Sequence, residues 1–201
     1  MSTYKIYERA RDLLVNPRGT WKVIRAESVT IKELFINYAT PLALIPAVAN
    51  LIGMTIVGIR MPLGDLVRAP FLPSLVGGIV GYILNLLGVL VGGWVVFKLA
   101  PLFESKTDFT TAVKLVLYSV TPIWLVGIFS VMPGLSVLAI LGLYAIYLLA
   151  VGMPIVLLTP GNKVFLFLLS TIVIGLLINI VLTMVIVGSI YGPMYMRMMA
   201  L

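Results

Sequence analysis

The sequence contains no cysteine and no histidine among its 201 residues. Without cysteine there is no disulfide framework, no thiol nucleophile and no thiolate metal site. Without histidine the chain lacks the usual general base and the commonest ligand of transition metals. We therefore predict a protein that is not an enzyme, with no catalytic residue, no cofactor and no metal site.

Charged residues are also scarce, at 10% of the chain, whereas hydrophobic residues make up 61%. A soluble domain has about 25% charged and about 45–50% apolar residues. This composition predicts an integral membrane protein. The net charge of +7 does not indicate a nucleic-acid partner, because the basic residues lie beside apolar runs, where they meet the bilayer and its anionic headgroups.

Long charge-free windows define the predicted membrane spans. A bilayer-spanning helix needs about 20 mostly apolar residues, and residues 34–59, 69–97, 115–162 and 164–196 meet this condition. The third window has 48 residues, enough for two helices, and Pro133–Gly134 supplies a turn signal near its middle. The sequence predicts an all-α polytopic bundle, residues 34–201, with five transmembrane helices at about 34–59, 71–97, 112–132, 135–158 and 164–192.

The distribution of basic residues predicts the orientation of the bundle. If the N-terminus is inside, the inner flanks carry eleven Lys and Arg residues and the outer flanks carry three. Cytoplasmic flanks of membrane proteins are enriched in these residues. We therefore expect a cytoplasmic N-terminus and a C-terminus on the outside.

Residues 1–33 are predicted to form cytoplasmic amphipathic helices at the membrane interface. Asn16–Pro17 is typical of an N-cap followed by the first turn of a helix. In that helix Trp21 falls on one side and Lys22 and Arg25 on the other, which suits the level of the headgroups. The stretch TIKE at residues 30–33 predicts a capping box that begins the first long helix. We expect these helices to lie on the membrane, and docking of a partner is the alternative.

Small residues follow one face of the second predicted span. They recur at spacings of three and four, and they include two G-x-x-x-G pairs. Such a face lets helix backbones approach closely, within the chain or between copies. The alternative is a path for an ion or lipid headgroup. The residues are Gly77, Gly81, Asn85, Gly88 and Gly92.

The third predicted span carries hydroxyl groups and a proline where the bilayer is apolar. Pro122 has no N–H and frees the carbonyl of Tyr118, and an orphan carbonyl is costly in hydrocarbon. We predict a polar knot between the third and fourth spans, and the alternative is a hydrated vestibule that binds a solute. The residues of this knot or solute path are Tyr118, Ser119, Thr121, Pro122, and Tyr144 or Tyr147, with Asn85 as a polar guide.

A short internal echo links the first and third spans. The stretches YATPLALIP, from Tyr38, and YSVTPIWLV, from Tyr118, share a tyrosine and a Thr-Pro pair near the inner face. Both helices enter the membrane from the same side. These matches are too few to establish a repeat.

Four short patterns are spread over the N-terminal segment and three of the spans. They are Pro-x-x-x-Trp-x-x-Ile-x-x-Glu from Pro17, Tyr-x-x-Pro-Leu from Tyr38, Tyr-Ser-x-x-Pro from Tyr118 and Tyr-x-x-Tyr-Leu-Leu from Tyr144. In these patterns the chain resembles the Yip family, the Ypt/Rab-interacting membrane proteins, in its compact prokaryotic form. The resemblance implies five spans, a cytoplasmic N-terminus and a place in a prokaryotic plasma membrane.

The resemblance also bears on function. Eukaryotic members of the family act in vesicle traffic and bind prenylated Rab GTPases, but their acidic D-L-Y-G-P signature is missing from this sequence. Binding of a Rab-type GTPase is therefore not expected. The leading hypothesis is a membrane-organising or interaction protein that forms a homo-oligomer. The alternative is a permease or channel for a small solute, an ion or a lipid that uses the break at Pro122.

Overall fold

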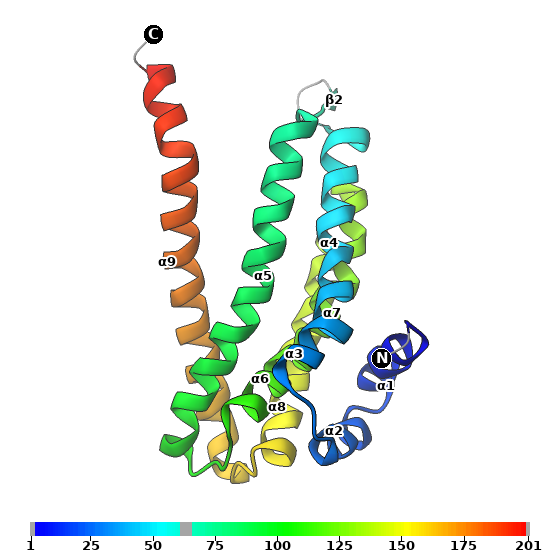
Figure 1. Cartoon of the computed structure of the whole chain (residues 1–201), viewed down its shortest axis with the longest axis vertical. Coiled ribbons are helices and arrows are strands. Elements are labelled where there is room, and N and C mark those ends of the chain that lie inside the picture. The colour runs from blue at the N-terminus through cyan, green and yellow to red at the C-terminus, as the bar shows by residue number, and fades with distance from the viewer. Residues whose placement is uncertain (1–2, 61–65, 200–201) are drawn as a thin grey trace.

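The computed structural model describes the backbone of residues 3–60 and 66–199. Most of this part is helical, and Figure 1 shows an elongated bundle whose long helices run up and down its axis. Five helices are long and apolar enough to cross a membrane, and the predicted all-α, five-span fold class is confirmed. They are Ile31–Val57, Phe71–Phe103, Phe109–Val131, Val137–Val156 and Gly161–Val181.

The elements follow one another with short connections. In chain order they are α1 (Thr3–Val15), α2 (Pro17–Ala26), α3 (Ile31–Leu34), α4 (Thr40–Ile52), β1 (Ile59–Arg60), β2 (Leu66–Val67), α5 (Phe71–Leu99), α6 (Phe109–Ser119), α7 (Thr121–Val126), α8 (Tyr144–Val156) and α9 (Val164–Met199). Turns of π-helix (Phe35–Ala39, Gly53–Val57) and 3-10 helix (Ala100–Phe103, Gly127–Val131, Pro133–Leu143, Gly161–Lys163) complete the spans.

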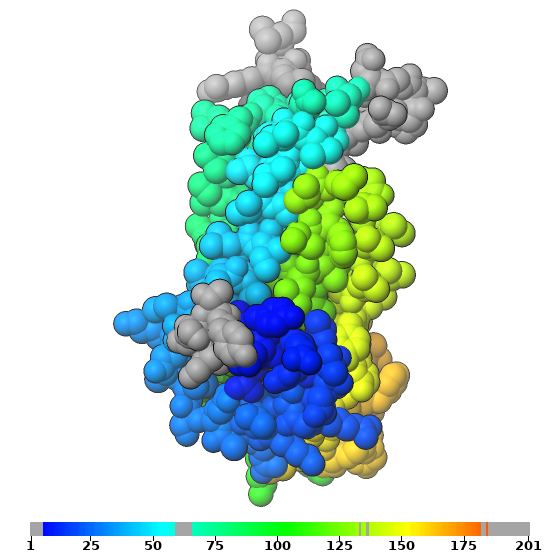
Figure 2. All heavy atoms as spheres, turned by 90° about the vertical axis from the view of Figure 1, so that its right-hand side faces the viewer, coloured from blue at the N-terminus to red at the C-terminus, as the bar shows by residue number. Residues whose placement is uncertain are grey.

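The helices α1 and α2 cover one side of the bundle near one end (Figures 1 and 2). We call this the inner end, because the charge distribution predicts that it faces the cytoplasm. The antiparallel pair β1–β2 lies at the opposite, outer end, where α9 also finishes (Figure 1). The second span is long: at about 1.5 Å per residue, the 29 residues of α5 measure about 43 Å, against about 30 Å of hydrocarbon. The bundle therefore extends beyond the hydrocarbon.

The first span begins at the predicted capping box. The Thr30 hydroxyl accepts a hydrogen bond from the Glu33 amide at 3.2 Å, and the Glu33 carboxylate accepts one from the Thr30 amide at 2.9 Å. One π-helical turn, Phe35–Ala39, then comes directly before the Thr40–Pro41 pair. Because proline has no N–H and crowds the preceding turn, the wider π turn lets the helix continue through it.

The third span starts at Asp108, whose carboxylate caps α6 by accepting a hydrogen bond from the Thr111 amide at 2.9 Å. Partial burial alone would raise the pKa of Asp108, but the hydrogen bonds from Thr111 outweigh it and lower the pKa below the ordinary value. The span ends where the chain turns at Met132, which is extended between two 3-10 segments. The turn predicted at Pro133–Gly134 is therefore confirmed.

Close contacts between the second and third spans occur at two glycines of α5. A Cβ added at Gly93 would lie 2.5 Å from a Val113 methyl group and 2.7 Å from the Val113 Cα. A Cβ at Gly92 would lie 3.1 Å from Val116. Gly93 was not among the predicted packing residues, yet it makes the tightest approach of α5 to α6.

Three of the four predicted packing glycines make no such contact within the chain. Around the Cβ positions of Gly77, Gly81 and Gly88, no atom of another described element lies within 4 Å. These glycines instead border open cavities that residues of the first, third and fifth spans also line, so the predicted tight intramolecular packing is wrong at these positions. Packing between copies stays a prediction.

We predict that Gly93→Ala destabilises the bundle, whereas the matched change Gly88→Ala does not. The new methyl group at residue 93 would collide with Val113, and overpacking of this kind costs about 1–3 kcal/mol. At residue 88 alanine meets open space and favours the helix by up to about 1 kcal/mol. Thermal unfolding of the two variants in detergent measures the difference, and equal melting temperatures would contradict this account of the contact.

Candidate functional site

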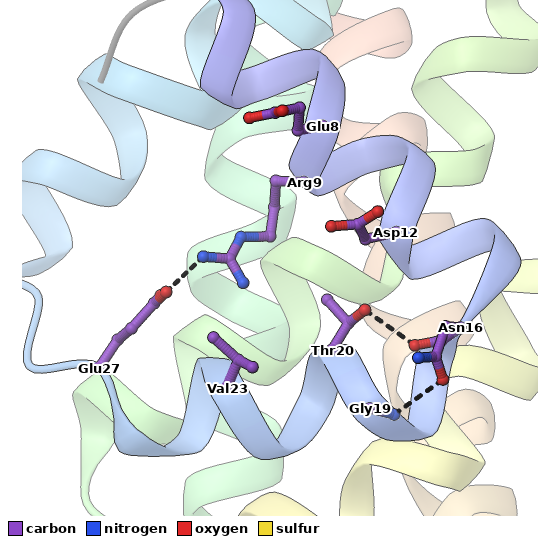
Figure 3. A pocket seen from close by; sticks show the side chains of 8 residues that line it. All are labelled: Glu8, Arg9, Asp12, Asn16, Gly19, Thr20, Val23 and Glu27. Atoms are coloured by element: carbon purple, nitrogen blue, oxygen red, sulfur yellow. Dashed lines mark hydrogen bonds and ion pairs between the residues drawn. The ribbon is translucent and has the colours of Figure 1, made fainter.

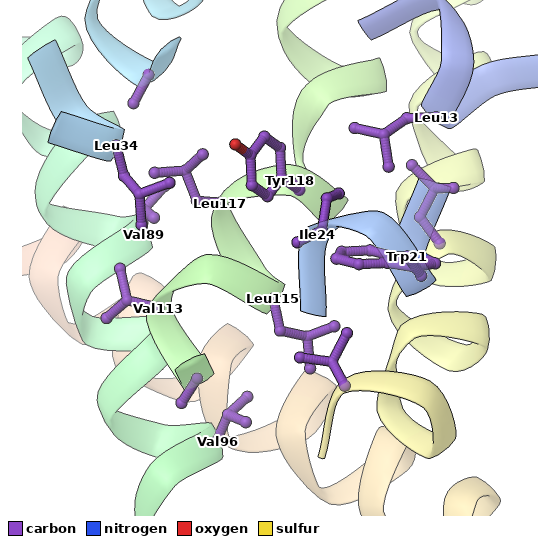
Figure 4. Close-up of a cluster of buried hydrophobic side chains, with 14 of the residues drawn as sticks. Leu13, Trp21, Ile24, Leu34, Val89, Val96, Val113, Leu115, Leu117 and Tyr118 are labelled. Atoms are coloured by element: carbon purple, nitrogen blue, oxygen red, sulfur yellow. The ribbon is translucent and has the colours of Figure 1, made fainter. Parts of the chain in front are cut away.

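The largest buried side chains gather where α2 meets α6 and α8. Figure 4 shows Trp21 and Ile24 of α2 packed beside Leu115 and Tyr118 of α6. We call this region the junction, and it comprises Trp21, Ile24, Tyr38, Lys114, Tyr118 and Thr121. It joins the N-terminal helices to the membrane spans, and it contains part of the predicted polar knot.

Helix α2 begins as the sequence predicted. Asn16 is its N-cap and accepts a hydrogen bond from the Gly19 amide at 3.2 Å, and Pro17 occupies the first turn. The Thr20 hydroxyl donates to the Asn16 carbonyl at 2.8 Å. These caps fix the face of α2 that turns toward the bundle, and Pro17, Thr20, Trp21 and Ile24 are buried on it.

Trp21 is buried inside the protein. Its side chain is 0% exposed, and its ring makes an edge contact with Tyr118 at 6.4 Å between centroids. A Cβ added at Gly152 of α8 would lie 2.9 Å from the Trp21 ring, so glycine makes room for the indole. The ring therefore does not contact headgroups as predicted, because the spans offer it a fully buried site. Lys22 and Arg25 are exposed, and their contact with headgroups stays a prediction.

Lys114 attaches the end of α2 to the third span. Its ammonium group donates hydrogen bonds to the Ile24 carbonyl at 3.1 Å and the Glu27 carbonyl at 2.6 Å, and the residue is 5% exposed. A cation at this place also suits the negative end of the helix dipole. The Glu27 side chain pairs with Arg9 of α1, so one ion pair and one lysine hold both N-terminal helices at the inner end.

The break in the third span is closed by the first span. The hydroxyl groups of Tyr38 and Thr121 share a hydrogen bond at 3.0 Å, and the Tyr38 and Tyr118 rings meet at 4.7 Å between centroids. The α6 helix ends at Ser119 and α7 begins at Thr121, so Pro122 lies in the first turn of a new helix, where its missing N–H is no loss. Tyr38 was not among the predicted knot residues.

The tyrosines of the fourth span do not join the knot. The Tyr144 hydroxyl donates to the Leu14 carbonyl of α1 at 3.0 Å, and Tyr147 is 45% exposed beside the Tyr144 ring. The prediction that they pair with Tyr118 is therefore wrong. Tyr144 reaches α1 instead, and the tyrosine that lies beside the break is Tyr38 of the first span.

Two other predicted residues also lie apart from the Tyr38–Thr121 pair. The Asn85 side chain accepts a hydrogen bond from the Trp124 indole at 2.7 Å, which links the second and third spans. Ser119 is buried, and within the described part its hydroxyl has no hydrogen-bond partner. The predicted knot is therefore not a single cluster. Tyr38–Thr121 and Asn85–Trp124 are two separate hydrogen bonds between spans.

Of the residues at the break, Val120 lines a cavity, whereas the predicted site residues do not. None of five cavities in the described part of the chain has Tyr118, Ser119 or Thr121 among its lining residues. All three are at most 2% exposed. Within the same part of the chain, no three histidine, cysteine or acidic side chains come together as a metal site.

Sequence reasoning missed Tyr38 and Lys114 as parts of the junction, and it missed the Arg9–Glu27 ion pair beside it. The echo between the Tyr38 and Tyr118 stretches was a usable signal, since it places both tyrosines at a similar depth in neighbouring helices. Lys114 is the last charge before the longest apolar window. A lysine at a membrane boundary is expected from the charge distribution alone, so no feature of the sequence indicated a contact between Lys114 and α2.

These features define a class: a polytopic helical membrane protein with an amphipathic N-terminal helix pair built into one end of its bundle. A family model, the Yip1 domain, matches residues 11–194. The chain therefore belongs to the Yip1 domain family, and the resemblance seen in the sequence is confirmed.

Two curated relatives are similar over nearly the whole chain. The inner membrane protein YohC of Escherichia coli strain K12 is 26% identical over 185 residues, which covers 90% of this chain and 95% of the relative. The protein of the same name from Escherichia coli O6:H1 gives the same values. No solved structure matches the chain. The family and the five apolar helices together make this chain a multi-pass membrane protein.

We predict that Lys114→Met loosens α2 from the bundle. The variant loses two charge-assisted hydrogen bonds to the Ile24 and Glu27 carbonyls, and each such bond is worth about 1.5–3 kcal/mol. Amide hydrogen exchange in α2 should therefore accelerate by roughly a hundredfold or more, while the core of α5 stays protected. Lys106→Met, an exposed lysine at the same end, is the control. Unchanged exchange in α2 would refute the anchoring role.

A double-mutant cycle tests the closed break. Tyr38→Phe and Thr121→Val should each lower the free energy of unfolding by about 1–3 kcal/mol, because each leaves one buried hydroxyl without its partner. The double variant should lose less than the sum of the two changes. In the control cycle Thr171→Val replaces Thr121→Val, and the effects should be additive. Additivity in both cycles would show that the two hydroxyl groups do not interact.

Proposed function

We propose that this chain is a non-enzymatic membrane-organising protein of the plasma membrane, which self-associates and presents its N-terminal helices to the cytoplasm. The observation that carries the proposal is the closed break. The hydroxyl groups of Tyr38 and Thr121 share a hydrogen bond there, and both residues are buried. A permease that worked through Pro122 would need water at this point. A break closed by a buried hydrogen bond favours a structural role for the polar residues.

The N-terminal helices support an interaction role. Because Trp21 and Lys114 fix α2 to the spans, the outward face with Lys22 and Arg25 has a defined position relative to the bundle. A surface that is held in place can bind anionic headgroups without first being ordered. The relatives named as inner membrane proteins support a prokaryotic plasma membrane location, and the excess of basic residues supports the cytoplasmic N-terminus.

The open glycine face supports self-association. Gly77, Gly81 and Gly88 present bare backbone to open space, since no atom of another described element lies within 4 Å of their Cβ positions. In lipid, helices associate through close backbone packing at small residues, since no hydrophobic force drives them together. A second copy is therefore the proposed partner. Neither nucleic acid nor a Rab-type GTPase is part of this proposal.

Gly81→Leu tests self-association without disturbing the fold. Within the single chain residue 81 borders open cavities that can accept the larger side chain, so we expect an unchanged melting temperature. A leucine in a contact between copies should cost about 1–3 kcal/mol, which weakens association about five- to 150-fold. Gly161→Leu, also in open space but in the inner loop, is the matched control. Fluorescence transfer between labelled copies in vesicles measures the association. Equal transfer in both variants would exclude this face as the contact.

One observation favours a second candidate, a permease or lipid-moving protein. A cavity of about 350 Å³ is lined by Asn85, Asn179 and the glycines Gly81 and Gly88. Polar groups that line a cavity within a bundle are typical of solute paths. Solute or ion flux in proteoliposomes that Asn85→Leu abolishes would establish this function. Flux that is abolished by Tyr118→Phe with Ser119→Ala would instead reopen the path through the break and overturn our proposal.

A further inference from the structure

An apolar groove of about 470 Å³ runs between α1 and the membrane spans. One wall is a face of α1 that includes Ala10 and Leu14. Pro41 and Ile45 of the first span and Leu125 of the third are part of the opposite wall. The volume falls within the range of about 300–1,000 Å³ that small-molecule sites occupy.

The two sides of α1 differ sharply in charge. On one side, Glu8 and Asp12 of α1 line a polar cavity of about 730 Å³ that α2 closes, where Arg9 pairs with Glu27 (Figure 3). On the other side, Arg11 is the one charged residue among the described residues that line the apolar groove. It is exposed, so it lies at the mouth of the groove.

The position of the groove determines which part of the bilayer it contacts. Its far wall belongs to the spans Ile31–Val57 and Phe109–Val131, so it faces hydrocarbon. The charged side of α1 keeps that helix at the level of the headgroups. Figure 2 shows α1 lying against this side of the bundle, below the upper part of α4. The groove therefore opens where headgroups and acyl chains meet.

We propose that the groove binds one acyl chain of an anionic glycerophospholipid from the inner leaflet, with Arg11 bound to its phosphate. The apolar lining matches an acyl chain, and a guanidinium group matches a phosphate in charge and geometry. A bilayer supplies this ligand at the mouth of the groove in large excess over any protein partner. The inference is independent of self-association, which uses the glycine face of α5.

Photolabelling of the full-length protein in vesicles tests the site. The vesicles contain phosphatidylcholine and a small fraction of phosphatidylglycerol or phosphatidylcholine that carries a photoreactive acyl chain. We expect labelled peptides from residues 6–15 and 41–45, with phosphatidylglycerol about fivefold above phosphatidylcholine. Arg11→Gln should reduce phosphatidylglycerol labelling to the phosphatidylcholine level, and Arg11→Lys should retain most of it.

The matched control is Arg18→Gln, an exposed arginine of α2 that does not line the groove. It should leave the labelling unchanged. Equal labelling by the two lipids, or an equal loss in Arg18→Gln, would show only a general effect of surface charge and would overturn the proposal. Labelling confined to other segments, or cross-links between two copies through this groove, would overturn it as well.

Discussion

The burial of Trp21 is the constraint on which the inner end of the protein depends. The indole enters the space that Gly152 leaves in α8 and meets Tyr118 of the third span. Full burial of so large a side chain stabilises the docked state by about 1.5–3 kcal/mol or more. Lys114 then fixes the end of α2, and Arg9 ties α1 to Glu27. An amphipathic segment thereby becomes part of the bundle.

Two polar pairs within the spans link helices to one another. Tyr38 joins the first span to Thr121 in the third, and Asn85 joins the second to Trp124. In hydrocarbon an unpaired hydroxyl or amide is costly. Lipid gives no hydrophobic force between helices, so hydrogen bonds between them help to stabilise the bundle. Polar residues of this kind stabilise the fold, and their presence in a span does not by itself indicate transport.

Two surfaces are left without partners in the chain, and their chemistry differs. The glycine face of α5 exposes backbone to open space and suits another helix. The groove beside α1 is concave and apolar with Arg11 at its mouth, and it suits a lipid. Both lie against the membrane, where a second copy and a phospholipid are the partners that the bilayer itself provides.

The sequence by itself determined the five spans, the N-cap at Asn16, the capping box at Thr30 and the turn near Pro133, because these depend on composition and on neighbouring residues. It did not determine the partners of the buried polar groups. Thr121 pairs with Tyr38, 83 positions away, and not with Tyr144. Only the tertiary structure decided this, because the choice depends on how the helices are rotated and how deep they lie, and neither is encoded in local spacing.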